Sequence, residues 1–155
     1  MNSIKTITFL DHTADAKFQA FGNSLEEAFI NAGTGMFELL TSDKVQPKIK
    51  HKIKIESSSK EALLFDFLDE LIFLLDTEGF IASEIEMFEI LTSNAGFIIQ
   101  TTVKGDYFKK YDVHGDIKAV TYNEMVIDEE YNQSKSKIKD KQQGWKVMVQ
   151  VVLDI

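Results

Sequence analysis

The sequence predicts an α+β domain in which two helices pack on one face of a mainly antiparallel or mixed sheet of about seven strands. Two stretches repeat apolar residues at intervals of three and four, as amphipathic helices do. After Gly79 the apolar period changes to two, which is the period of strands. Strands and helices do not alternate regularly along the chain, so a parallel βαβ arrangement is not expected.

Both helices have a start signal in the sequence. Ser24 and Glu27 form a capping box, in which each side chain satisfies a free backbone donor, and an apolar stripe then continues to Leu40. Ser58 and Glu61 repeat this pattern before a longer, leucine-rich stripe. The two stripes give each helix one apolar face to lay against a sheet.

Strand-like segments flank and follow the helices. Their apolar residues alternate or form short runs at residues 4–9, 17–21, 50–56, 85–91, 97–103, 107–113, 117–128 and 145–153. Glycine-containing turn signals at residues 93–96, 104–106 and 114–116 separate the later segments. This succession indicates hairpin-connected, antiparallel strands.

Length and composition favour a single domain over residues 1–155. The net charge of −8 repels a phosphate backbone, so direct high-affinity binding of a nucleic acid is not expected. The chain has no cysteine, which excludes a disulfide framework, a thiol nucleophile and a cysteine zinc site. No apolar run reaches 18 residues and the N-terminus lacks the pattern of a signal peptide, so a cytoplasmic location without membrane contact is expected.

Acidic residues at both ends of the chain form the strongest candidate site. Residues 11–15 place two carboxylates, an imidazole and a hydroxyl between two strand-like segments. At the other end, an apolar strand stops at Asp154, beside the terminal carboxylate of Ile155. If the last strand lies beside the first, Asp15, Asp154 and the Ile155 carboxylate supply hard oxygen ligands of the kind that calcium and magnesium prefer. The alternative is that these are ordinary solvated acids at strand ends.

Other polar residues are weaker candidates, and each has a structural alternative. His12 either orients the carboxylates or caps a turn. Asp69 and Glu70 interrupt the leucines of the second helix and form either a docking surface or a solvated helix face. Lys118 either reaches an acid near the site or extends its ammonium into solvent. Residues 134–141 form a basic loop, which is either a solvated hairpin loop or a docking patch for an anionic partner.

The common catalytic motifs are absent from the sequence. There is no glycine-rich phosphate loop, no G-x-S-x-G elbow and no H-E-x-x-H pair. The three histidines lie far apart in unlike contexts, so a histidine-rich transition-metal site is not expected. A metal-dependent hydrolase would also need a base or a nucleophile near the carboxylates, and none is evident. The groups that remain as candidates are carboxylates, and a metal-dependent hydrolase stays open as an alternative that an assay for phosphoester turnover with calcium, magnesium or manganese would test.

Five segments, taken in order and spacing, resemble the archease family across essentially the whole chain. They are Asp11-His12-Thr13-Ala14-Asp15, Ser24-Leu25-Glu26-Glu27-Ala28-Phe29, Leu63-Leu64-Phe65-Asp66-Phe67-Leu68-Asp69-Glu70-Leu71, Ile117-Lys118-Ala119-Val120-Thr121-Tyr122 and Leu153-Asp154-Ile155.

The resemblance implies a function. Archeases are small activators of the RNA-splicing ligase that works through a guanylylated histidine; they promote its guanylylation and its repeated turnover in tRNA splicing or RNA repair, and they are not ligases themselves. It also implies a divalent ion, calcium in known members, with magnesium or manganese as alternatives, held by the residues matching Asp15, Asp154 and Ile155. A second hypothesis is a chaperone or scaffold for RNA-modifying enzymes whose metal is purely structural.

Overall fold

A computed structural model describes residues 5–11, 14–133 and 144–155. The two α-helices are α1 (Leu25–Gly35) and α2 (Lys60–Glu78), and two short 3-10 helices, η1 (Met36–Leu39) and η2 (Phe108–Lys110), follow α1 and the fifth strand. The described residues form seven strands: β1 (Ile7–Leu10), β2 (Asp15–Gly22), β3 (Ile49–Ser57), β4 (Phe80–Ser93), β5 (Gly96–Tyr107), β6 (Ala119–Asp128) and β7 (Val147–Asp154).

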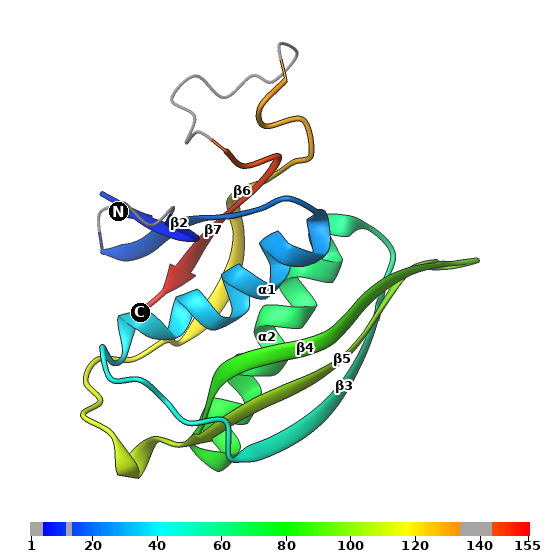
Figure 1. The fold of residues 1–155 in the computed structure, drawn as a ribbon. Coiled ribbons are helices and arrows are strands. Elements are labelled where there is room, and N and C mark those ends of the chain that lie inside the picture. The colour runs from blue at the N-terminus through cyan, green and yellow to red at the C-terminus, as the bar shows by residue number, and fades with distance from the viewer. Residues whose placement is uncertain (1–4, 12–13, 134–143) are drawn as a thin grey trace.

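The strands form two sheets, and all strand pairs in them are antiparallel. One sheet has four strands in the order β1-β2-β7-β6, and the other has three in the order β3-β5-β4. Both helices contact strands of both sheets, so they form a layer between them (Figure 1). The predicted fold class is confirmed, and each sheet has both helices on one of its faces.

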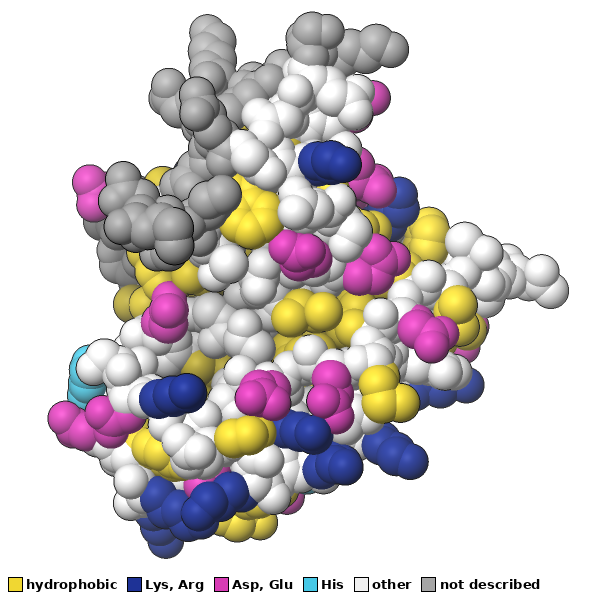
Figure 2. Space-filling model, in the orientation of Figure 1, with side chains coloured by type: hydrophobic (Ala, Val, Ile, Leu, Met, Phe, Trp, Pro, Cys, Tyr) yellow, Lys and Arg dark blue, Asp and Glu magenta, His cyan; other side chains and the backbone are white. Residues whose placement is uncertain are grey.

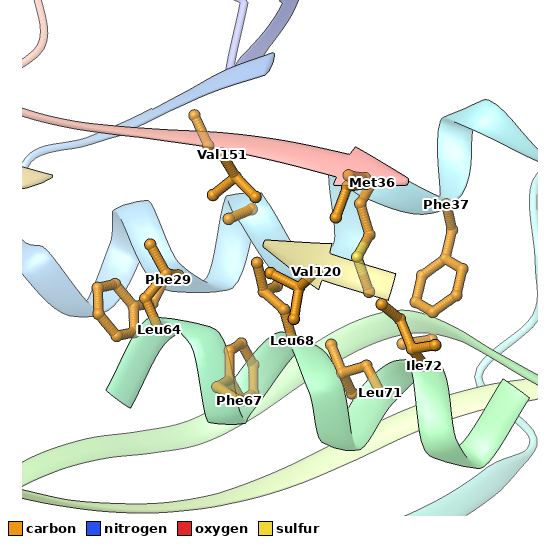
Figure 3. Close-up of a cluster of buried hydrophobic side chains, with 14 of the residues drawn as sticks. Phe29, Met36, Phe37, Leu64, Phe67, Leu68, Leu71, Ile72, Val120 and Val151 are labelled. Carbon is orange, nitrogen blue, oxygen red and sulfur yellow. The ribbon is translucent and has the colours of Figure 1, made fainter. Parts of the chain in front are cut away.

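The core lies where the helix layer meets the sheets. Phe29 of α1, Phe67 of α2, Val120 of β6 and Val151 of β7 are each at most 4% exposed and belong to one cluster (Figure 3). In the described part of the chain, no helix is long and apolar enough to cross a membrane.

Both helices begin at serine caps, but the second cap differs from the prediction. Ser24 Oγ accepts a hydrogen bond from the backbone N–H of Glu27, as the capping box requires. For α2 the cap is Ser59 and not Ser58, because its Oγ accepts from the N–H of Ala62. The first helix also ends sooner than expected, at Gly35, and its last apolar residues form η1.

Two predictions on β5 were wrong, and tertiary contacts explain both. The turn expected at residues 104–106 lies inside the strand: Gly105 is there because any Cβ would come within 1.9 Å of the Ile81 carbonyl oxygen. The strand expected at residues 107–113 is replaced by η2 and an irregular segment.

Asp106 shapes this replacement. Its carboxylate is fully buried and accepts hydrogen bonds from the Tyr111 hydroxyl, the Tyr107 N–H and the Lys110 ammonium. The bond from Tyr111 contributes most to holding the pKa of Asp106 below its ordinary value. The segment after β5 thus curls around a buried carboxylate and does not continue as a strand.

Candidate functional site

The β2–β7 ladder brings the two predicted acidic residues together. Asp15 is the first residue of β2 and Asp154 the last of β7, and the register makes them direct cross-strand partners. Their neighbours Ala16 and Leu153 are buried toward the helices, at 7% and 0% exposure. Since side chains alternate along a strand, the Asp15 and Asp154 carboxylates share the outer face of the four-stranded sheet, away from the helix layer.

The backbone around this acidic pair is fixed from both sides. Ala14, just before β2, has a φ of 63°, a left-handed conformation that is uncommon for a residue with a Cβ. On the other side, Asp154 pairs with Ala119 of β6, and its carbonyl accepts a 2.8 Å hydrogen bond from the Lys118 N–H. Ile155 follows directly and is 44% exposed. Asp154 therefore lies on a central strand, held between two neighbours.

Polar side chains continue along the same outer face. One row from the acidic pair, the Lys17 ammonium lies 3.3 Å from the Glu124 carboxylate. In the next row, Gln19 donates to Gln150 at 2.9 Å, and Gln150 donates to the Glu124 carbonyl at 2.8 Å. Glu124 sits in an irregularity of β6, between residues 121 and 126, with a φ of 52°. These contacts build a polar band next to Asp15 and Asp154.

Most residues of this polar band are not among the site residues that the sequence predicted. Lys17 and Gln19 alternate with buried residues along β2, which is a readable sign of a polar outer face. No pattern in the sequence indicates that Glu124 belongs to this face. A bulge in β6 turns Glu124 toward Lys17, and the sequence does not predict the bulge.

Of the other predicted residues, the described ones do not bring their side chains to the acidic pair. Lys118 is exposed and its ammonium forms no ion pair within the described residues, although its backbone N–H binds Asp154. Asp69 and Glu70 lie on α2, and Glu70 interacts electrostatically with His51 of β3, in the three-stranded sheet. Burial, followed by the charge of Asp69, raises the pKa of Glu70, and His51 opposes that rise. His12 and the basic loop at 134–141 lie outside the described residues.

The donor set at the acidic pair suits a hard divalent cation. In the described ranges 5–11, 14–133 and 144–155, no three His, Cys, Asp or Glu side chains are grouped to hold a metal ion. Asp15 and Asp154 supply two carboxylates, and the third oxygen donor in the predicted set is the main-chain carboxylate of Ile155. Like charges directly opposite each other destabilise an antiparallel pair, and a cation relieves that repulsion.

Fold and site together define a small two-sheet α+β domain that carries an acidic pair on the outer face of its four-stranded sheet. The model of the archease protein family matches residues 8–155. The chain belongs to the archease family, as the sequence predicted.

Individual relatives agree over the full length. An archease from Methanosarcina barkeri is 36% identical over 157 residues, covering 97% of each chain. One from Pyrobaculum neutrophilum is 36% identical, covering 94% of this chain and 92% of its own.

Two solved structures share the fold. The solution structure of a Methanobacterium thermoautotrophicum protein has a TM-score of 0.74 at 32% identity, covering 97% of this chain and 99% of its own. The crystal structure of a Thermotoga maritima archease, described as a possible chaperone, has a TM-score of 0.50 at 21% identity and covers 94% of both chains. The second likeness concerns the fold alone.

Proposed function

We propose that this chain is a non-catalytic activator of the RNA-splicing ligase, promoting ligase guanylylation and multiple turnover when RNA ends are joined. The observation that carries the proposal is membership of the archease family over residues 8–155, since the resemblance implies this role. The ligase is then a protein partner, and RNA is reached through it.

The chemistry of the described residues supports an activator over an enzyme. No cysteine exists in the chain, and neither His51 nor His114 is hydrogen-bonded to a hydroxyl within the described residues. The polar groups that do gather, on the outer face of the four-stranded sheet, are carboxylates, amides and one lysine. Such a surface suits the binding of an ion or of a protein partner.

We further propose that Asp15, Asp154 and the terminal carboxylate of Ile155 hold a divalent ion, calcium in the first instance. The cross-strand register supports the pairing of the two side chains. The hydrogen bond from the Lys118 N–H and the β6 ladder hold the Asp154 backbone in place. A bound ion would supply charge neutralisation at this edge, so that an acidic surface can approach an active site that handles a nucleotide triphosphate.

The experiment is a dose series in RNA ligation by the ligase from the same organism. An activator raises product above one turnover per ligase when it is added well below one equivalent, because it is released and used again. A chaperone or scaffold with a purely structural metal instead raises product in proportion to its own amount and levels off at one equivalent. No effect of the protein at any ratio contradicts the activator role, and the function must then be sought among scaffolding roles for other RNA-modifying enzymes.

A further inference from the structure

The outer face of the three-stranded sheet carries two strips of opposite charge. Lys50, Lys52 and Lys54 alternate along β3 with residues whose side chains turn toward the helices, such as Ile53 and Ile55, so the lysines point outward and are exposed. On β4, two strands away, Glu84, Glu86 and Glu89 face the same side. We call these the lysine strip and the glutamate strip.

The β5 register places the two strips in matching rows. Through their shared β5 partners, Lys50 lies in one row with Glu84, Lys52 with Glu86 and Lys54 with Glu89. Two strand spacings, about 9.6 Å, separate the strips within one molecule. Figure 2 shows carboxylates and lysines close together over this part of the molecule, with the lysines gathered toward its lower edge.

Most of these charges have no ion-pair partner in the part of the chain that the structure describes. Glu86 is paired, since the Lys104 ammonium from β5 lies 2.9 Å from its carboxylate. Among the described residues, no ion pair involves the three residues of the lysine strip, nor Glu84 or Glu89. Five of the six strip charges are therefore available to a partner.

We propose that this face binds the same face of a second copy of the chain, around a two-fold axis parallel to the strands. Such a rotation places β3 of one copy over β4 of the other. Each row keeps its position along the strand direction, so it lies over the same row of the partner. Lys50 then meets the partner's Glu84, and Lys54 meets the partner's Glu89. Each contact occurs twice, as in every isologous interface.

The charge pattern selects this partner over others. A two-fold axis across the strands would lay lysine on lysine and glutamate on glutamate, which costs energy. A nucleic acid would gain from the lysine strip but would meet the glutamate strip beside it, in a chain of net charge −8. A second copy satisfies both strips together.

The shape of the face agrees with its charge pattern. A hollow of about 340 Å³ lies on it, lined by Lys52, Lys54 and Met87 among others. Met87 lies in the bulge between Glu86 and Glu89 and is 76% exposed. In the proposed dimer, each Met87 lies over β3 of its partner between Lys52 and Lys54, where the hollow opens.

The size of the face predicts a weak dimer. Three strands and about four rows cover roughly 400 Å² per copy, which is below a standard interface and typical of transient association. The proposed dimer is held mainly by ion pairs between exposed charges. Because salt screens such charges, the dimer should dissociate at high salt.

Two charge-reversal variants test the proposal. The first carries Lys50→Glu and Lys54→Glu, and the second carries Glu84→Lys and Glu89→Lys; both leave the Lys104–Glu86 ion pair intact. Mass is measured by light scattering and sedimentation from about 1 μM to about 1 mM protein, at low salt and near 1 M salt. A variant with Lys44→Glu and Lys146→Glu, two exposed lysines outside the face, matches the charge change of the first.

The expected result is that the wild type and the control dimerise at high concentration and low salt, while each reversal variant stays monomeric. An equimolar mixture of the two reversal variants should regain the mass of a dimer, because every reversed charge then meets its opposite. A monomeric wild type throughout would overturn the proposal. So would reversal variants that dimerise alone, a mixture that stays monomeric, or a wild type that stays monomeric while binding an RNA oligonucleotide through the lysine strip.

Discussion

Replacing Asp154 with Asn should change the stability of the protein in opposite directions with and without calcium. Asp154 faces Asp15 across the β2–β7 ladder, and like charges opposite each other cost about 0.2–1 kcal/mol. In a chelator, Asp154→Asn removes this repulsion and keeps the side-chain shape. The variant should therefore unfold about 0.4–4 °C above the wild type, given about 2–4 °C per kcal/mol for a chain of this length.

Calcium should reverse that order. At a calcium concentration about 100 times the dissociation constant, binding to the folded state alone adds about 2.7 kcal/mol, or about 5–11 °C. The variant lacks one of the proposed ligands, so the same calcium should raise its melting temperature much less. Thermal unfolding followed by circular dichroism, once with chelator and once with calcium, measures both effects.

Asp76→Asn provides the matched control, because Asp76 is an exposed carboxylate on α2 that belongs to no proposed site. It should follow the wild type under both conditions. The reasoning is refuted if Asp154→Asn is less stable than the wild type in chelator, or if calcium shifts the variant and the wild type equally.

Three further predictions concern the chain end, a carboxyl group on α2 and the core. A peptide extension after Ile155 converts its carboxylate into an amide, so calorimetry should show weaker calcium binding than for an N-terminal extension; equal affinities would exclude the terminal carboxylate as a ligand. Burial raises the pKa of Glu70 above its unfolded value, so the folded state binds more protons and stability falls as pH rises through this window. Glu70→Gln should therefore raise the melting temperature at pH 7, with a gain that disappears at pH values below about 4.5; an equal gain at both pH values would contradict this assignment. Phe67 is fully buried and packs edge-on against Phe88 with ring centroids 5.3 Å apart, so Phe67→Ala should lower the free energy of unfolding by about 3–5 kcal/mol in a denaturant titration; a loss below about 1 kcal/mol would show that the site is not packed as described.

Periodicity was enough to predict the elements but not their arrangement. The apolar stripes identified α1 and α2, and the period of two identified most strands, because both patterns are local. Division into two sheets depends on which strands pair, which is a long-range property. The prediction of a strand at residues 107–113 was wrong for the same reason, because long-range contacts decide the structure there. Burial of Asp106 and its hydrogen bond from Tyr111 override a strand-like composition.

The acidic pair could be anticipated, but its register could not. Polar residues near both chain ends suggested that Asp15 and Asp154 would meet if the end strands were neighbours. Their direct pairing depends on the β2–β7 register, and a slip of one residue would have put one carboxylate on the buried face. Glu124 could not be predicted at all, because a bulge that no local signal marks brings it to Lys17.

The most direct test of the account is multiple-turnover RNA ligation with Asp15→Asn, compared with the wild type and with Asp76→Asn, each added well below one equivalent of ligase. Binding to the ligase is measured on the same samples. The account predicts that Asp15→Asn still binds the ligase but leaves ligation at a single turnover, while Asp76→Asn supports many turnovers as the wild type does. Full activation by Asp15→Asn would contradict the claim that the acidic pair is the working site of this protein.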